Sequence, residues 1–212
     1  DNRKMAMAEG GESALSDAVQ AGNPIAQLQM GLSKLESGDI ETGVKLIRAS
    51  ANQDQPAALY RLAKLYESGD GVTADAAMAR QLTERAARNG NRIAMHDLAL
   101  YYAEGRGDVD VNIETAAKWF EKAAQRGVVD SQYNLGVLFE SGQGLPRNLT
   151  EAYVWYSIAA AQGDDYARKH ITVLKNQINA GDVTRAENRV AEFKPVSIDE
   201  EANGIFRDLA CA

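Results

Sequence analysis

The sequence has few of the residues on which most catalytic and metal sites depend. It contains one cysteine, Cys211, and two histidines, His96 and His170. A single cysteine excludes an intrachain disulfide, and neither histidine has a Cys or His neighbour at metal-ligand spacing. Gly-x-Ser-x-Gly is absent, and the Gly-x-Gly pairs lack the third glycine of a dinucleotide loop. We therefore expect that the chain is not an enzyme and that it has no catalytic residue, no cofactor site and no metal site.

Basic residues are in the minority, and long apolar runs are missing. Lys and Arg number 23 against 30 Asp and Glu, which gives a net charge of -7. Scattered cations do not form the basic stripe that a phosphate backbone requires, so nucleic acid is excluded as a partner. No apolar run approaches the roughly 18 residues of a membrane span, and no signal peptide is visible. Because the chain starts without Met, we expect a piece of a longer protein, with any membrane segment outside it.

What the sequence does contain is a repeat. Three segments, residues 59–90, 95–127 and 132–163, resemble one another throughout. Gly69, Gly105 and Gly142 follow each other at steps of 36 and 37 residues. A fixed period of this length is the signature of a solenoid, and 45% hydrophobic content supplies a core. The sequence therefore predicts an all-α fold, a right-handed α-solenoid of antiparallel helix hairpins.

Each repeat reads as a helix, a glycine loop, a second helix and a glycine turn. Leu62, Leu65 and Tyr66 recur at helical spacing and stop at the Gly69 loop, because glycine readily adopts the left-handed conformation that ends a helix. Small residues hold one matched position, which predicts a close approach of the two helices: Ala63, Ala99 and Gly136. Tryptophans occupy another matched position, and we expect them to pack as wedges between successive hairpins: Trp119 and Trp155.

The repeat also sets the expected domain boundaries. Residues 1–13 are expected to be a flexible N-terminal segment, and 14–193 the solenoid, which starts with a capping helix. Its units are about 24–55, 56–90, 91–127 and 128–163, followed by a closing hairpin at 164–193 with Gly181-Asp182 between its helices. Residues 194–212 have no period and are expected to form a C-terminal tail or linker.

Partner-binding residues are expected on the first helix of each repeat, which in related helical repeats lines the concave surface. Positions not needed for packing within a hairpin are free to specify a partner, and the amphipathic rings among them are enriched at interfaces. Two interpretations stay open: the rings face a groove, or they pack within the repeat with only their edges in water. The predicted positions are Tyr60, Arg61, Lys64, His96, Asp97, Leu100, Tyr133, Asn134 and Val137.

The repeat motif resembles the Sel1-like repeat, a relative of the tetratricopeptide repeat with a longer first loop. The third unit carries it most fully, in Leu135-Gly136, Leu138-Phe139-Glu140-Ser141-Gly142-Gln143-Gly144, Ala152, Trp155-Tyr156, Ala159-Ala160 and Gly163. The second unit has Ala99 in place of Gly, and the first lacks the aromatic pair. This resemblance implies a non-catalytic scaffold that binds other proteins.

A narrower resemblance concerns Phe193 to Gly204, which follows the repeats and reads Phe-Lys-Pro…Glu-Glu-Ala-Asn-Gly. This arrangement is similar to the periplasmic region of alphaproteobacterial polar localisation factors of the PodJ type. It implies a periplasmic location in a membrane-anchored protein, envelope proteins or peptide segments as partners, and a role in polar organelle development and cell-division asymmetry. The alternative is a peptidoglycan-binding module of the cell envelope, in which second-helix aromatics stack on sugars.

Overall fold

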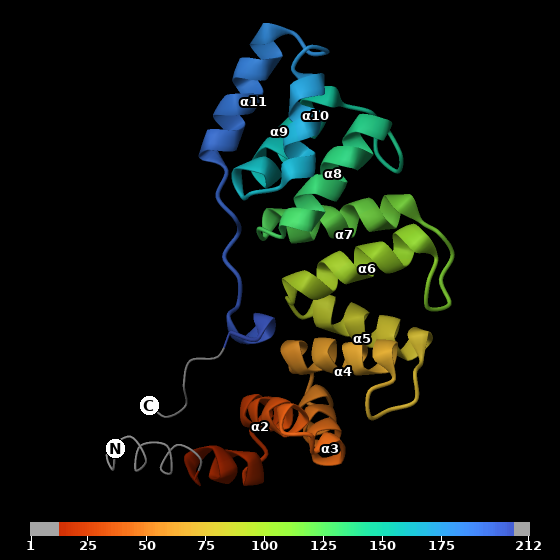
Figure 1. The fold of residues 1–212 in the computed structure, drawn as a ribbon, viewed down its shortest axis with the longest axis vertical. Coiled ribbons are helices and arrows are strands. Elements are labelled where there is room, and N and C mark those ends of the chain that lie inside the picture. Colours follow the sequence, from red (N-terminus) through yellow and green to blue (C-terminus); the bar gives the residue numbers. More distant parts are fainter. Residues whose placement is uncertain (1–12, 206–212) are drawn as a thin grey trace. The chain divides into compact units, whose positions relative to one another are not determined.

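The structure, a computed structural model, describes residues 13–205 (Figure 1). Over this range it contains α-helices, one short 3-10 helix and no strand, as the sequence predicted. A helix through residues 13–20 is followed by α2 (Pro24–Glu36), α3 (Ile40–Ala51), α4 (Pro56–Ser68), α5 (Ala76–Arg88), α6 (Arg92–Glu104), α7 (Ile113–Gln125), α8 (Val129–Ser141), α9 (Leu149–Ala161), α10 (Asp165–Leu174), α11 (Ala180–Glu192) and η1 (Glu201–Asn203).

The described chain divides into two compact units. Unit 1 contains residues 13–91 and 199–205, and unit 2 contains Arg92–Ile198. In unit 1, α2 pairs with α3 and α4 pairs with α5. In unit 2, α6 pairs with α7 and α8 pairs with α9. The repeating element of each unit is thus a pair of consecutive helices, which buries the apolar stripe of both partners.

Helix ends follow the glycine pattern of the sequence. Gly69 and Gly142 end α4 and α8 in the left-handed conformation, with φ of 80° and 73°. This confirms that the glycine loops end helices. At position 144 glycine is required for a steric reason as well, because a Cβ there would lie 2.7 Å from the carbonyl carbon of Ile113 at the start of α7. Gly144 therefore also permits the loop of one repeat to pack closely against the second helix of the preceding repeat.

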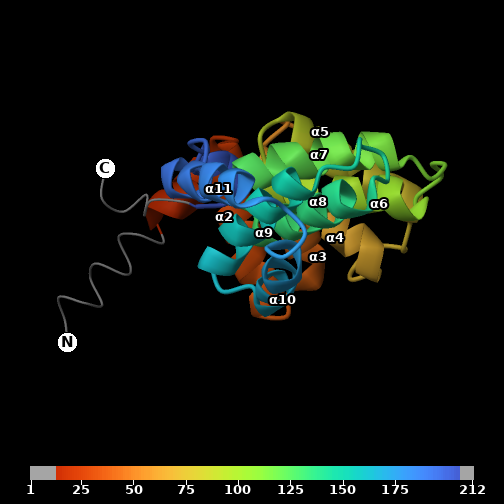
Figure 2. The ribbon, with the colours of Figure 1, turned by 90° about the horizontal axis from the view of Figure 1, so that it is seen from above.

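The end of unit 2 differs from the expected closing hairpin in its details. α10 stops at Leu174, and Gly181 lies inside the first turn of α11 rather than between the helices. The side chain of Asn179 fixes the start of α11 by accepting a hydrogen bond from the backbone N–H of Asp182 at 2.9 Å. Both helices pack chiefly on α9, which lies between them in Figure 2.

The two tryptophans are half-buried and occupy different surroundings. Trp119 packs on the cluster of Ala99, Ala116 and Phe120, and Lys122 Nζ lies 4.3 Å from its ring centroid. The ring of Trp155 meets that of Phe193 edge-on at 5.9 Å. Trp155 therefore anchors the residue that follows α11, a contact that the repeat period does not predict because Phe193 lies beyond the last repeat.

Candidate binding surface

The three predicted positions on α4 belong to unit 1. Arg61 is exposed, whereas Tyr60 and Lys64 are half-buried. Lys64 Nζ lies 5.9 Å from the centroid of the Tyr60 ring and also pairs with Glu67 one turn later. The α4 face thus presents a ring with its own cation beside it, an arrangement that is attractive because the ring face carries negative potential.

On α6, the predicted positions His96, Asp97 and Leu100 are all half-buried. His96 is committed to packing within unit 2: its Nδ1 lies 2.8 Å from Ser131 Oγ, and its ring centroid lies 5.6 Å from that of Phe120. Burial lowers the pKa of His96, an effect that the nearby carboxylates of Asp97 and Asp130 partly oppose. For this position the structure favours packing within the repeats.

On α8, Tyr133, Asn134 and Val137 are half-buried as well. Tyr133 sits at the centre of a group of rings, 5.5 Å from Tyr156, 5.9 Å from His170 and 6.5 Å from Tyr166. Its pKa is raised by burial first and then by the carboxylates of Asp164 and Glu140. Tyr133 therefore both packs and lies in a negative electrostatic environment.

Two exposed apolar residues of α10 were absent from the sequence prediction, and one of them, Tyr166, belongs to this group. Tyr166 is 69% exposed, and Val173 is also exposed. Val173 lies 36 residues after the predicted Val137, so the repeat period carried to one more helix would have found it; it was missed because the glycine pattern lapses after Gly163. Tyr166 lies 36 residues after Asp130, which is not a predicted position, so the period does not indicate it.

A partly buried hydrogen-bond network joins α10 to α8 and α9. Glu140 Oε2 accepts a hydrogen bond from the hydroxyl of Tyr156 at 2.7 Å and lies 2.8 Å from Nδ1 of His170. The rings of Tyr156 and His170 stack at 4.5 Å. The pKa of Tyr156 is strongly raised, mainly by burial and then by Glu140, so its hydroxyl stays a proton donor. These contacts hold Tyr133 and Tyr166 in place.

We call Tyr133, Tyr166 and His170 the ring surface, with Asp164 and Glu140 as its neighbouring carboxylates. All five residues belong to unit 2. The structure thus joins the predicted Tyr133 to α10 residues, whereas the predicted Tyr60 belongs to unit 1 and is outside this group. The roles of the nine predicted positions in binding stay predictions, which the experiments below test.

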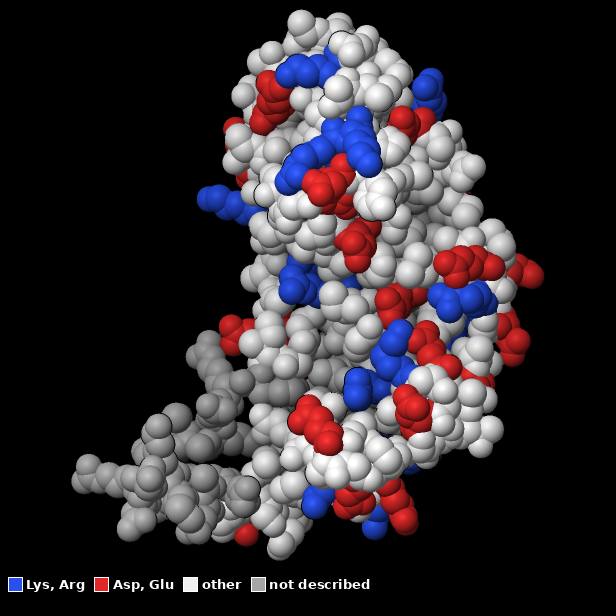
Figure 3. Space-filling model, viewed as in Figure 1, with Lys and Arg blue, Asp and Glu red and all other residues white. Residues whose placement is uncertain are grey.

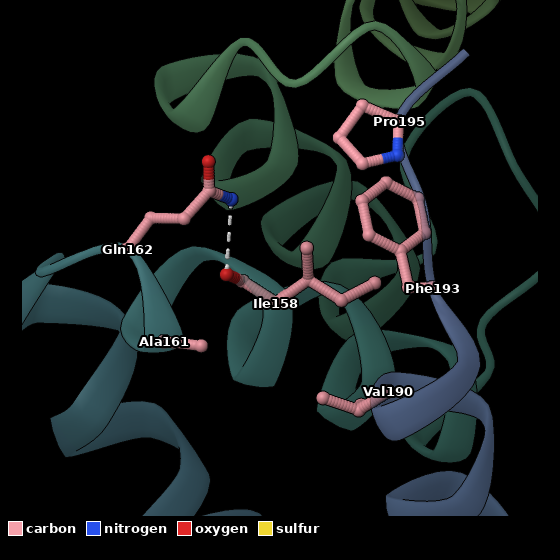
Figure 4. Close-up of a pocket in the computed structure, with 6 residues that line it drawn as sticks. All are labelled: Ile158, Ala161, Gln162, Val190, Phe193 and Pro195. Atoms are coloured by element: carbon pink, nitrogen blue, oxygen red, sulfur yellow. Dashed lines mark hydrogen bonds between the residues drawn. The ribbon is translucent and has the colours of Figure 1, made fainter.

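Unit 2 also contains a hollow of about 300 Å³ beside α9 and α11 (Figure 4). Ile158 points toward Phe193, and the ring of Pro195 lies next to that of Phe193, while Val190 also lines the hollow. Gln162 supplies a side-chain amide, but its Nε2 is engaged by Gln132 Oε1 at 2.6 Å and by the carbonyl of Ile158 at 3.1 Å. The lining residues are all uncharged, so the hollow offers no acid, base or nucleophile for catalysis.

Charges of both signs are intermixed on the face shown in Figure 3. Within residues 13–205, no group of three or more His, Cys, Asp and Glu side chains is placed to hold a metal ion. No helix in the same range combines the length and the apolar character that crossing a bilayer demands.

Comparison with known proteins identifies the repeat. The Sel1 repeat model matches residues 56–91, 92–128 and 129–164. The "Chitin synthase regulator SKT5" of Saccharomyces cerevisiae is 36% identical over 110 residues, which are 50% of this chain and 16% of that protein. The "Exopolysaccharide production negative regulator" of Rhizobium meliloti is 27% identical over 153 residues, which are 66% of this chain and 57% of that protein. The chain thus spans less than two thirds of either relative.

Among solved structures, the Sel1 repeat protein from Oxalobacter formigenes is similar, with a TM-score of 0.72 and 32% identity. The similarity covers 76% of this chain and 47% of that one. It confirms the solenoid fold class, and the two relatives named above are regulators rather than enzymes by name. The matched repeats coincide with the helix pairs α4–α5, α6–α7 and α8–α9 and take up just over half of the sequence, so the chain belongs to the Sel1 repeat family.

Proposed function

We propose that this chain is a non-catalytic scaffold that binds a segment of another protein on the ring surface of unit 2. The observation that carries the proposal is the Tyr166 side chain, which is 69% exposed while its ring centroid lies 6.5 Å from that of Tyr133. A large exposed ring on a rigid support suits an interface anchor, because little side-chain freedom is lost on binding. The Sel1 repeat is an interaction fold, which supports the same function.

The partner segment is basic in this proposal. Asp164 and Glu140 place negative charge beside Tyr133, and Asp130 does so beside His96. Lys169 Nζ already lies 5.2 Å from the centroid of the Tyr166 ring, which shows that a cation fits over that ring. A Lys or Arg of the partner would take a similar place, with carboxylates nearby to favour its charge.

The biological setting is the finer part of the proposal. We place the chain in the periplasm, as part of a membrane-anchored polar localisation factor involved in polar organelle development and cell-division asymmetry. The Phe193–Gly204 segment, which resembles that family, is the support for this assignment. The bacterial relative, a regulator of exopolysaccharide production by name, is consistent with work at the cell envelope.

The test is an affinity pull-down from cell-envelope extract with the wild-type chain and a Tyr166→Ala variant. Val111→Ala is the matched control, because Val111 is 61% exposed in the same unit but lies in the loop between α6 and α7. We expect defined proteins to be retained by wild type and control and lost with Tyr166→Ala. Equal recovery by all three chains would refute the ring surface as the binding site.

The same preparation addresses the peptidoglycan alternative. If the chain recovers no protein but sediments with purified sacculi, the glycan-binding module replaces the protein scaffold. Localisation is tested separately by fractionating cells that carry the full-length protein. Recovery of this region with the cytoplasmic fraction would refute the periplasmic assignment.

A further inference from the structure

The segment expected to be a tail or linker contains a compact turn that is docked on unit 1. Asp199 Oδ1 accepts a hydrogen bond from the N–H of Ala202 at 3.0 Å, and the N–H of Gly204 donates to the carbonyl of Glu201 at 3.2 Å. Ala202 is buried, and η1 packs against α4 (Figure 1). Residues 199–204 thus form a closed turn that presents one small side chain.

Two buried amide side chains of unit 1 hold the backbone of this turn. Gln55, 6% exposed, donates from Nε2 to the carbonyl of Glu201 at 3.0 Å. Asn91, 3% exposed, donates from Nδ2 to the carbonyl of Ala202 at 2.8 Å. The two residues immediately precede α4 and α6, so they are one repeat apart. Two successive repeats therefore each supply one donor to the same short piece of main chain.

The side-chain oxygen of Gln55 caps α4, but the repeat does not need an amide donor at this position. The equivalent residue before α8 is Val128, which makes no side-chain cap hydrogen bond. A buried amide is costly unless it is hydrogen-bonded, and here the docked turn supplies partners for both donors. Asn203 adds a bond in the other direction, from its Nδ2 to the carbonyl of Gly90 at 3.3 Å. The surface therefore combines a helix cap with amide donors that bind the main chain of the turn.

We propose that the surface of unit 1 formed by Gln55, Gly90 and Asn91 is a peptide-binding site for a turn of the form Asp-x-x-Ala-Asn-Gly. In this structure the chain's own Asp199–Gly204 fills it as an intramolecular ligand. A segment of another protein with the same chemistry binds by displacing that ligand. This goes beyond the proposed function, because the ring surface lies in unit 2 and shares no residue with this site.

The proposed site recognises both the main chain of the turn and one of its side chains. The donors on Gln55 and Asn91 bind carbonyls, which every peptide has. Selectivity comes from Ala202, which is 3% exposed, so a larger side chain at this position would have to displace its neighbours. An attached ligand has an effective concentration in the millimolar range, so a partner of about 10 µM affinity would bind roughly 100-fold more weakly while the turn is docked.

The experiment uses the full chain with Ala202→Glu, which is expected to release the turn. The probe is a fluorescent synthetic peptide with the sequence of residues 197–205, titrated by anisotropy. A peptide carrying Glu in place of Ala202 is the control ligand. Asn203→Ala is a second releasing variant, should Ala202→Glu disturb folding, since it removes the bonds from Nδ2 to the carbonyls of Gly90 and Asp199.

Site variants are chosen to remove the donors alone. Gln55→Glu keeps the oxygen that accepts the N–H of Ala58 at 2.7 Å and so preserves the start of α4, but it lacks the amide donor. Asn91→Asp is the corresponding change at the second donor. Each is combined with the releasing substitution, and folding is checked by circular dichroism.

We expect the releasing variant to bind the peptide at least about 10-fold more tightly than wild type. Binding should be lost with the control peptide and with either site variant. A folded releasing variant that does not bind the peptide would overturn the proposal. Binding that is retained in both the Gln55→Glu and the Asn91→Asp variants would overturn it as well. A wild-type dimer in sedimentation that Ala202→Glu dissociates would show that a second copy fills the site, which overturns the intramolecular assignment.

Discussion

Gly136 of α8 lies directly against the ring of Tyr156 of α9. A Cβ on Gly136 would be 2.8 Å from both Cδ1 and Cε1 of that ring, closer than carbon atoms normally approach. Gly31 has the same relation to Ile47, with 2.8 Å to its Cγ1. The small residue that the repeat places on its first helix is therefore the complement of a large residue on its second helix. In this way each helix pair sets its own spacing.

Gly136→Val is expected to lower the free energy of unfolding. Tyr156 is fully buried and held by Glu140, so its ring cannot move away, and overpacking of this kind costs about 1–3 kcal/mol. Chemical denaturation measures the change. Ala191→Val, at an exposed position of α11, controls for the helix propensity of valine and should change stability by less than about 1 kcal/mol. Equal effects of the two substitutions would contradict the packing argument.

The stability of unit 2 is expected to depend on the protonation of His96. Burial holds the pKa of His96 below its ordinary value of 6.5, so the unfolded chain takes up the proton more readily than the folded chain. Stability from this group is therefore present above pH 6.5 and is lost as the pH falls toward the lowered folded value. Denaturation curves between about pH 8 and pH 5 should show this loss for wild type.

His96→Gln is the comparison, because glutamine cannot gain a charge. The part of the pH dependence that belongs to His96 should disappear in this variant. All other ionisable groups are the same in both chains, so their contributions cancel from the difference. Parallel curves for wild type and His96→Gln would show that burial of His96 does not affect stability in this range.

Thr83→Val is expected to raise stability. Thr83 is fully buried in α5, and its hydroxyl has no hydrogen-bond partner among the described residues. Valine has the same shape without the hydroxyl, and removing a buried unsatisfied group recovers about 1 kcal/mol. The rise should appear in Tm and in the denaturation midpoint. Thr83→Ser, which keeps the hydroxyl and removes a methyl group, should have the opposite effect; a gain from serine would refute this explanation.

Lys169→Ala is expected to strengthen binding of a basic peptide to the ring surface. Lys169 lies over the Tyr166 ring and competes for the place that a partner cation would take. Because cation–π contacts at exposed sites are worth about 0.5–1 kcal/mol, the gain should be roughly two- to fivefold. Calorimetric titration with a Lys-rich peptide measures it.

Tyr166→Phe and Tyr166→Leu complete this comparison. Phenylalanine keeps the ring face and should bind nearly as wild type, whereas leucine should lose affinity by a similar two- to fivefold factor. Affinity should also fall as salt is raised, because the carboxylates near Tyr133 act through screened charge. Equal binding by phenylalanine and leucine would remove the cation from the proposed recognition.

Much of the fold could be predicted from the sequence because the repeat acts locally. Gly69 and Gly142 end helices through their own backbone conformation, and the apolar stripes between such glycines predict helices without knowledge of distant residues. The match of small residue to large residue, as at Gly136, likewise recurs with the period. These features depend on neighbours within a single repeat.

The binding surface was predicted less completely, and the reason is geometric. The period placed Tyr133 and His96 on the first helices, but it does not tell which side of a half-buried ring contacts protein. His96 turned out to be committed to Ser131 and Phe120, and Tyr133 to residues of α10 that lie beyond the last glycine repeat. Which side of each ring contacts protein is decided by side-chain contacts between helices, and these depend on the angles at which the helices cross.

The sequence by itself determined that this protein is a chain of paired helices with a regular period, because glycine conformation and apolar spacing act over a few residues. Only the tertiary structure decided that Tyr133 and Tyr166 meet and that Ala202 docks between Gln55 and Asn91. These contacts join residues separated by up to 146 positions. No local propensity encodes such a pairing, because it becomes favourable only when packing brings buried donors and carbonyls together.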